Sequence, residues 1–238
     1  MGGRRAVTEA IRSGAASEVL VAHGVRTTQG LREVLDAARD AGLPVREVPR
    51  SELDVVGPDH QGVVARIASP RELGERDLAT WPFTDDAVVV VLDGVSDPQN
   101  LGAAARSAEA VGAEMFVSRI RRAAPVTSVA IAASSGALLH LPHARLANIP
   151  RALERLAEHG FSVIGLDETA TATVYDEACP QGRVAVVIGS EGEGMARLTR
   201  ERCERLVSLP MRGRVGSLNA AASLAAVLYS YVVPSRGE

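Results

Sequence analysis

The sequence predicts an α/β protein, in which a small N-terminal α/β module precedes a larger α/β domain with a parallel sheet. Helix and strand signals alternate along the chain, residues 87–92 form an unbroken apolar run, and a stretch rich in proline, glycine and charge divides the alternating regions. A chain of 238 residues can hold a small and a medium domain, and its 46% hydrophobic residues suffice for a sizeable core.

We expect residues 1–68 to form the first module. Its expected elements are a short amphipathic helix that includes 7–11, a strand at 18–22, a helix at 28–41, a strand at 45–48, a helical turn capped by Ser51, and a strand at 62–68. Gly42 and Pro44 are typical of residues that follow a helix end. This βαβ-like order favours a compact α/β module.

Residues 69–83 predict a linker, because Pro70, Gly74 and Pro82 stand among charged residues. The apolar run that comes next is typical of a strand buried on both faces. Helix and strand signals then alternate over 101–111, 114–117, 126–133, 149–158, 162–166, 184–188, 206–209 and 218–233. Residues 84–238 are therefore expected to form a parallel α/β domain.

Composition excludes some function classes. The net charge of −3 does not indicate a nucleic-acid binder, so any binding of RNA would need local patches of arginine. The 26 basic residues are all arginine, which GC-rich codon usage explains best. An aromatic content of 3% argues against stacking bases on an aromatic sheet. No apolar run is long enough to span a bilayer and no signal peptide is evident, so we expect a cytoplasmic protein with Cys179 and Cys203 reduced.

The first polar loop after a strand covers residues 93–106. Pro98 stiffens a turn, and Asn100 stands where a helix N-cap is expected, so capping and function explain this residue equally well. Arg106 is the one long side chain in a helical stretch of small residues. A functional role is favoured for Arg106, with a solvated helix-surface arginine as the alternative.

The second loop, residues 187–195, is rich in glycine. Its glycines follow the order G-x-x-G-x-G, which differs from the dinucleotide fingerprint, and the chain has no phosphate-binding G-x-x-x-x-G-K-[ST] loop. The carboxylate of Glu191 within the loop disfavours a phosphate ligand. A neutral or cationic ligand fits better, and a sulfonium is one such ligand.

The third loop, residues 209–219, leads into the final helix. Ser217 could cap that helix, in which case Asn219 would lie in its first turn with an amide that capping does not explain. Arg212 and Arg214 would suit phosphate contacts, although exposed loop arginines are common.

Together, the three loops resemble the SpoU (TrmH) class of SPOUT RNA methyltransferases. The matching motifs are residues 100–106, residues 189–195, and residues 209–211 with 217–219. Residues 3–11, followed by 60–62, resemble the L30e-like RNA-binding module that precedes the catalytic domain in bacterial 23S rRNA guanosine 2′-O-methyltransferases.

The resemblance implies a C-terminal trefoil knot, S-adenosylmethionine as cofactor, a homodimer, no metal, and RNA as substrate, with 23S rRNA favoured. It places cofactor contacts on Gly189, Leu209, Met211, Ser217 and Leu218. Catalytic roles fall on Arg106, Asn100, Glu191 and Asn219. RNA contacts fall on Arg4, His60, Gln61, Arg212 and Arg214.

Three other interpretations stay open. The target could differ, as in a tRNA 2′-O-methyltransferase or an antibiotic-resistance enzyme that acts elsewhere on 23S rRNA. The chain could be a non-catalytic RNA-binding protein with a decayed cofactor pocket, which the complete set of motif residues disfavours. A nucleotide-binding α/β enzyme is the weakest alternative, because the phosphate-loop signatures are missing.

Overall fold

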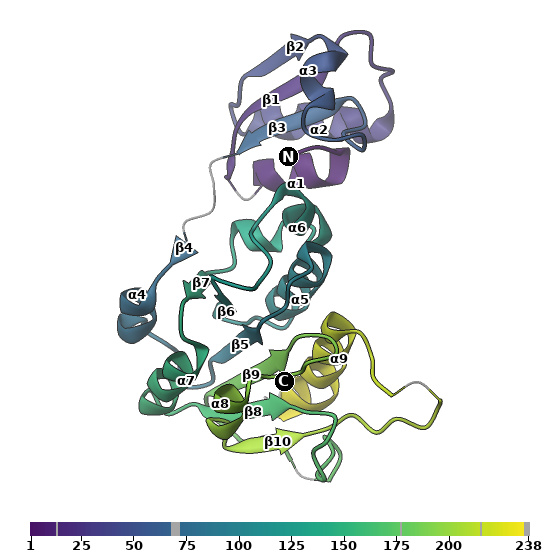
Figure 1. The fold of residues 1–238 in the computed structure, drawn as a ribbon. Coiled ribbons are helices and arrows are strands. Elements are labelled where there is room, and N and C mark those ends of the chain that lie inside the picture. Colours follow the sequence, from purple (N-terminus) through teal and green to yellow (C-terminus); the bar gives the residue numbers. More distant parts are fainter. Residues whose placement is uncertain (13, 68–71, 177, 215, 236–238) are drawn as a thin grey trace.

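The computed structural model describes residues 1–12, 14–67, 72–176, 178–214 and 216–235 (Figure 1). A three-stranded sheet lies in the N-terminal part, and a seven-stranded sheet organises the rest. The predicted α/β fold class is confirmed.

The small sheet has the order β2-β1-β3, with β1 parallel to β2 and antiparallel to β3. The elements of this part are α1 (Arg4–Arg12), β1 (Ala16–Ala22), α2 (Gln29–Asp40), β2 (Val45–Val48), α3 (Arg50–Asp54) and β3 (Val63–Ile67). Apolar residues of α1 and α2 pack with one face of the sheet, and Leu53 of α3 packs with the other face. Apolar residues therefore pack on both faces of the small sheet, although Val48 is the one buried residue of its edge strand β2.

The helix ends agree only in part with the sequence prediction. Gly42 follows α2 with a φ of 66°, the left-handed conformation expected of a residue beyond a helix end. Ser51 does not cap the next helix, because α3 already begins at Arg50 and Pro49 occupies the cap position. Proline has no side-chain acceptor, so the first turn of this short helix has no side-chain cap.

The large sheet is parallel throughout, with the order β10-β8-β9-β5-β6-β7-β4. Its strands are β4 (Glu72–Leu73), β5 (Val88–Asp93), β6 (Met115–Arg119), β7 (His143–Leu146), β8 (Ser162–Leu166), β9 (Val184–Gly189) and β10 (Arg205–Val207). Every residue of the adjacent central strands β5 and β9 is buried, as the apolar runs predict.

Helices cover both faces of this sheet. They are α4 (Glu75–Thr80), α5 (Pro98–Ala110), α6 (Ser128–Ala133), α7 (Ile149–Glu158), α8 (Arg197–Glu201) and α9 (Ala220–Val227), with a 3₁₀ turn at Ala137–Leu139 and further helical turns at Leu228–Val232 and Val233–Ser235. Val88 and Val90 pack on the side of α5, α6 and α9, whereas Val89 and Val91 pack on the side of α4 and α7. Alternate residues of one strand thus fill two separate apolar layers.

The predicted linker at 69–83 differs from the structure over most of its length. Residues 69–71 lie outside the described residues, but β4 and α4 occupy most of residues 72–83, and β4 pairs with β7 at the edge of the large sheet. Proline and glycine residues stand at the ends of these short elements. The stretch therefore has the composition of a linker although it contains a strand and a helix.

Strand β7 was not predicted, because His143 and Arg145 interrupt its apolar pattern. In the structure His143 is buried, and its Nε2 lies 2.8 Å from the hydroxyl oxygen of Ser118. Burial, aided by the nearby charge of Arg145, lowers the pKa of His143 to about 4. The ring is therefore neutral at physiological pH and is compatible with a core strand.

Helix α1 joins the small module to the large domain. Its Val7 and Ile11 belong to the same apolar cluster as residues of α5 and α6. At the turn after α6, Gly136 has a φ of 92°, and a Cβ placed there would lie 2.1 Å from Cγ of Glu9. The two parts of the chain are thus in direct van der Waals contact, with α1 next to α6 (Figure 1).

Helix α9 packs against α5 near the C-terminus of the chain. The trefoil knot implied by the resemblance stays a prediction. Across the described ranges, no helix combines the length and the hydropathy that crossing a bilayer requires.

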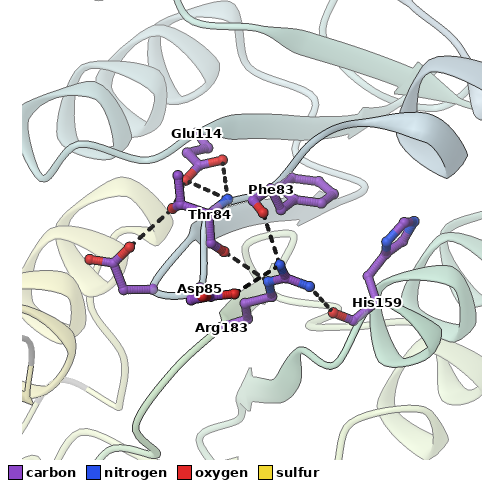
Figure 2. Close-up of polar contacts among 7 residues, drawn as sticks. Phe83, Thr84, Asp85, Glu114, His159 and Arg183 are labelled. Atoms are coloured by element: carbon purple, nitrogen blue, oxygen red, sulfur yellow. Dashed lines mark hydrogen bonds and ion pairs between the residues drawn. The ribbon is translucent and has the colours of Figure 1, made fainter.

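Arg183, at the start of β9, fixes the entry to β5 (Figure 2). Its guanidinium donates to the carbonyl oxygens of Phe83 (2.8 Å), Thr84 (2.8 Å) and His159 (2.7 Å). The carboxylate of Glu114 accepts from the backbone N–H of Thr84 and from its hydroxyl. These bonds tie the segment before β5 to the ends of α7 and the neighbouring strands.

Arg183→Ala is expected to destabilise the protein by about 2 kcal/mol, because three carbonyl groups lose a charged donor. Arg183→Lys should recover only part of this loss, since an ammonium lacks the planar fork that reaches three acceptors. Urea unfolding followed by circular dichroism measures both values. Arg39→Ala is the control: among the described residues this exposed arginine pairs with Asp36 alone, so a loss as large as that of Arg183→Ala would contradict the assignment.

Candidate active site

A cavity of about 460 Å³ lies at the carboxyl ends of β8, β9 and β10. The loops that follow these three strands form its walls. All five residues for which cofactor contacts were predicted line it, namely Gly189, Leu209, Met211, Ser217 and Leu218. The carboxyl edge of a parallel sheet is where ligands are expected to bind.

The glycine-rich loop after β9 folds back on itself. Ser190 and Gly194 exchange backbone hydrogen bonds of 3.1 and 3.0 Å. Gly189 faces this turn so closely that an added Cβ would lie 2.0 Å from the carbonyl carbon of Gly194 and 2.2 Å from the nitrogen of Met195. The wall of the cavity at this point is therefore main chain, and the position accepts only glycine.

Asp93, at the end of β5, holds the far end of this loop. Its carboxylate is buried, and Oδ2 accepts a hydrogen bond of 2.8 Å from the backbone N–H of Ala196. Oδ1 lies 2.8 Å from Nη2 of Arg119 at the end of β6. Neither residue was among the predicted site residues, although a carboxylate directly after a fully apolar run was a usable signal.

Asn100, Glu191 and Asn219 meet beside the cavity. Oε1 of Glu191 accepts from Nδ2 of Asn100 at 2.9 Å and from Nδ2 of Asn219 at 2.6 Å. Nδ2 of Asn219 also lies 2.8 Å from Oδ1 of Asn100. Three loops that are distant in the sequence thus contribute to one polar cluster, as the resemblance implies.

The capping interpretations change accordingly. Asp97 caps α5 by accepting from the N–H of Gln99 at 2.8 Å, so Asn100 lies inside the first turn with its side chain available to Glu191. Asn219, and not Ser217, is the cap of α9: its Oδ1 accepts from the N–H groups of Ala221 and Ala222. A single asparagine amide caps with its oxygen and donates with its nitrogen, so capping and function are not alternatives here.

Arg106 lies on the exposed face of α5 and does not line the cavity of its own chain. Because an α-helix has about 3.6 residues per turn, Arg106 points roughly 120° away from Asn100 around the helix axis. Within the described part of the chain, its guanidinium has no hydrogen bond or ion pair.

The charged groups around the cavity leave an excess of carboxylate. Arg200 pairs with Asp167 at 2.7 Å, and Arg197 pairs with Glu201 at 2.5 Å. Three further carboxylates line the cavity without a cationic partner among the described residues: Glu168, Glu191 and Glu193. This electrostatic environment favours a cationic ligand over a phosphate.

Cys203 lies close to this edge of the sheet, where its Sγ packs against Gly165 of β8. Burial raises the pKa of its thiol to about 12, and the carboxylates of Asp93 and Asp167 contribute to the shift. The thiol therefore stays protonated at neutral pH and is not a thiolate nucleophile. Cys179 and Cys203 are not joined by a disulfide bond. Among the described residues, no cluster of three or more His, Cys, Asp or Glu side chains could hold a metal ion.

Two of the residues expected to contact RNA in the first module, His60 and Gln61, lie in a tight turn, and the third, Arg4 of α1, contacts this turn. His60 is 1% exposed, its Nε2 lies 2.9 Å from Oδ1 of Asp54, and its Nδ1 accepts from the N–H of Gly62. His60 thus supports the exposed turn at Gln61 from inside the module, and an RNA contact at this turn stays a prediction. The guanidinium of Arg4 donates to the hydroxyl of Thr28 and to the carbonyl of Gln61.

Arg212 and Arg214 are exposed in the loop before α9. Neither forms an ion pair with another described residue, so both guanidinium groups can bind an external anion. Their place near the mouth of the cavity is compatible with the RNA contact predicted for them.

Comparisons with known proteins agree with this geometry. Residues 87–229 match the SpoU rRNA Methylase family, and residues 2–73 match the family described as RNA 2′-O ribose methyltransferase substrate binding. A tRNA/rRNA methyltransferase of Mycobacterium ulcerans is 41% identical over 234 residues, which span 95% of this chain and 74% of that protein. A TrmH family tRNA/rRNA methyltransferase of Staphylococcus haemolyticus is 38% identical over 232 residues, 95% and 92% of the two chains.

A solved structure supports the cofactor. The SpoU methyltransferase AviRb from Streptomyces viridochromogenes, in complex with AdoMet, superposes with a TM-score of 0.79 at 27% identity and covers 98% of this chain and 88% of its own. The negatively charged cavity walled by main chain is thus similar in setting to a known AdoMet-binding fold.

Proposed function

Because the chain belongs to the SpoU rRNA methylase family of RNA methyltransferases, which use S-adenosylmethionine, we propose that it methylates a ribose 2′-hydroxyl in RNA. The proposed target is a guanosine of 23S rRNA. The observation that carries the proposal is the cluster of Asn100, Glu191 and Asn219 beside a cavity with unpaired carboxylates. The substrate-binding match over residues 2–73 supports ribose as the acceptor.

The residues around the cavity fit S-adenosylmethionine. Gly189 admits a close approach of main chain, Leu209, Met211 and Leu218 offer apolar surface, and the carboxylates suit a sulfonium charge. When bound, this cofactor supplies a methyl carbon activated by a positively charged sulfur. The contribution of the chain is to position the RNA hydroxyl, to exclude water and to offer an acceptor, Oε2 of Glu191, for the proton that the hydroxyl loses as its oxygen bonds to the methyl carbon.

We assign to Glu191 the role of orienting the ribose. Two asparagine amides and the N–H of Ala220 all bond to Oε1, and Oε2 has no hydrogen bond to a described residue. Oε2 can therefore accept a hydrogen bond from a ribose hydroxyl. Asn100 and Asn219 then act as positioning residues that hold this carboxylate in one orientation.

We assign to Arg106 the stabilisation of negative charge at the reacting oxygen. A guanidinium holds its proton too tightly to act as a free base, so Arg106 would clamp an adjacent phosphate and stabilise the developing alkoxide. Because Arg106 points away from the cavity of its own chain, this role requires a homodimer in which it reaches the cavity of the partner. Exposed apolar side chains on the same side of the protein support such an interface: Val129, Tyr229 and Val233.

The choice between RNA classes rests on the first module. We propose that residues 1–68 bind the RNA substrate and that residues 84–238 catalyse methyl transfer, with β4 and α4 attached to the second unit. The relatives are named for both tRNA and rRNA, which makes a tRNA 2′-O-methyltransferase the second candidate.

A methyl-transfer assay tests the proposal. We expect tritium from methyl-labelled S-adenosylmethionine to enter rRNA and to be recovered in dinucleotides that resist alkaline hydrolysis, because a 2′-O-methyl group removes the nucleophile of that cleavage. Label in alkali-released mononucleotides would instead indicate base methylation and contradict the ribose assignment. Parallel reactions with tRNA decide between the substrate classes, and mapping ribose methylation in rRNA from cells with and without the gene locates the target.

A further inference from the structure

We propose that the loop of residues 120–123, which follows β6, is an RNA-backbone contact in which Arg121 and Arg122 bind phosphate groups between the first module and the cavity. This inference rests on the RNA substrate of the proposed function and adds a binding surface to it. None of the loop's residues was singled out by the sequence motifs, and none lines the cavity.

Arg121 and Arg122 are exposed and unpaired. Neither has an ion pair or a hydrogen bond with any residue that the structure describes. The arginines on either side are neutralised: Arg119 pairs with Asp93 at 2.8 Å, and Arg145 pairs with Glu72 at 2.9 Å. In a chain with more acidic than basic residues, two adjacent uncompensated guanidinium groups form a local site for anions.

The loop is anchored at both ends. The N–H of Ile120 donates to the carbonyl of Leu146 at 3.0 Å, and the carbonyl of Ile120 accepts from Arg145 at 3.3 Å. At the other end, the N–H of Ala124 donates to the carbonyl of Val95 at 2.9 Å. The backbone between these anchors is short, so the two side chains project from a fixed base and lose little freedom on binding.

The anchors also place the loop on the way from the first module to the reacting groups. Val95 lies in the turn between β5 and α5, shortly before Asn100. In the other direction the chain continues through α6 to Gly136, against which Glu9 of α1 packs. The loop thus links the turn that precedes Asn100 with the helix that α1 contacts, so an RNA bound at both places would pass this loop.

Arg122 has a backbone conformation that its side chain does not favour. Its φ of 55° lies in the left-handed region, where a residue with a Cβ is strained and glycine is not. This strain makes Arg122 a position where a functional use of the guanidinium can be tested. Because guanidinium groups bind phosphate oxygens through paired N–H donors, a nucleic-acid backbone is the partner that fits two neighbouring arginines best.

The strain provides a clean test with the full-length protein. Arg122→Gly removes the charge and relieves the backbone, so its thermal stability should equal or exceed that of the wild type. Arg121→Ala removes the neighbouring charge, and Arg76→Ala on α4 is the matched control, since Arg76 is also exposed and without an ion pair among the described residues but lies on the opposite face of the large sheet. Affinity for protein-free rRNA is measured over a salt series, and S-adenosylmethionine affinity is measured by calorimetry.

We expect Arg121→Ala and Arg122→Gly each to lower the slope of log affinity against log salt by about one, as the loss of one phosphate contact should. KM for RNA should rise while kcat and cofactor affinity stay at wild-type values, and Arg76→Ala should change none of these. Unchanged slopes in both loop variants would overturn the inference, as would an equal loss in Arg76→Ala. Failure of the proposed function is read separately, from the wild-type protein: absence of RNA methylation there refutes the activity itself.

Discussion

Arg106→Ala is expected to slow methyl transfer by on the order of 100-fold or more, because the variant lacks the preorganised donor that we propose for the developing alkoxide. Cofactor affinity should stay within about twofold of the wild type, since we place Arg106 against the RNA phosphate and the reacting oxygen and not against the cofactor. Single-turnover transfer to rRNA measures the first quantity, and calorimetric titration with S-adenosylmethionine measures the second. Wild-type turnover in this variant would remove Arg106 from the mechanism.

Mixing two inactive variants tests whether Arg106 acts across a dimer. Arg106→Ala lacks the arginine, and Glu191→Gln lacks the carboxylate that we place against the ribose. If Arg106 serves the cavity of the partner, random exchange of subunits creates mixed dimers with one complete site, and about a quarter of the wild-type activity should return. If Arg106 acts within its own chain, no mixture contains a complete site and no activity returns.

Gly189→Ala is expected to weaken S-adenosylmethionine binding by on the order of 100-fold, or about 2.7 kcal/mol. The new Cβ would lie 2.0 Å from the backbone carbon of Gly194, so the loop that walls the cavity must move. A backbone held by Asp93 through Ala196 cannot yield as a flexible side chain would. Calorimetric titration of the cofactor measures the effect.

Gly213→Ala is the matched control, because it adds the same methyl group to the loop after β10. A Cβ at Gly213 meets no atom within 4 Å, and cofactor affinity should not change. Thermal unfolding of both variants separates a local effect from misfolding. Unaltered affinity in Gly189→Ala, at normal stability, would mean that the loop after β9 does not define the cavity.

The sequence was informative where local pattern determines structure. The apolar runs at 87–92 and 184–188 are β5 and β9 within one residue, because a strand buried on both faces needs no polar side chain. Strand β7 escaped notice because His143 becomes neutral only in its buried setting, and β4 because two residues form no recognisable pattern. Both strands form because they pair with neighbouring strands, and a single sequence does not show this pairing.

For the candidate site, too, the sequence predicted what local pattern determines and missed what contacts between distant residues determine. The sequence placed Asn100, Glu191 and Asn219 at strand ends, and the parallel sheet brings them together. It did not identify the pairing of Asp93 with Arg119, because their contact depends on β5 and β6 being neighbours. Pattern alone also could not determine the orientation of Arg106 or the burial of His60.

The packing of α1 against the turn at Gly136 bears on how a long RNA is addressed. If the two parts keep this contact, a nucleotide bound by the first module, as we propose, lies at a fixed distance from the cavity that holds the methyl donor. The choice of target would then depend on the distance in the folded RNA between the nucleotide bound by the first module and the ribose that is methylated. The bases between these two nucleotides would be free to vary.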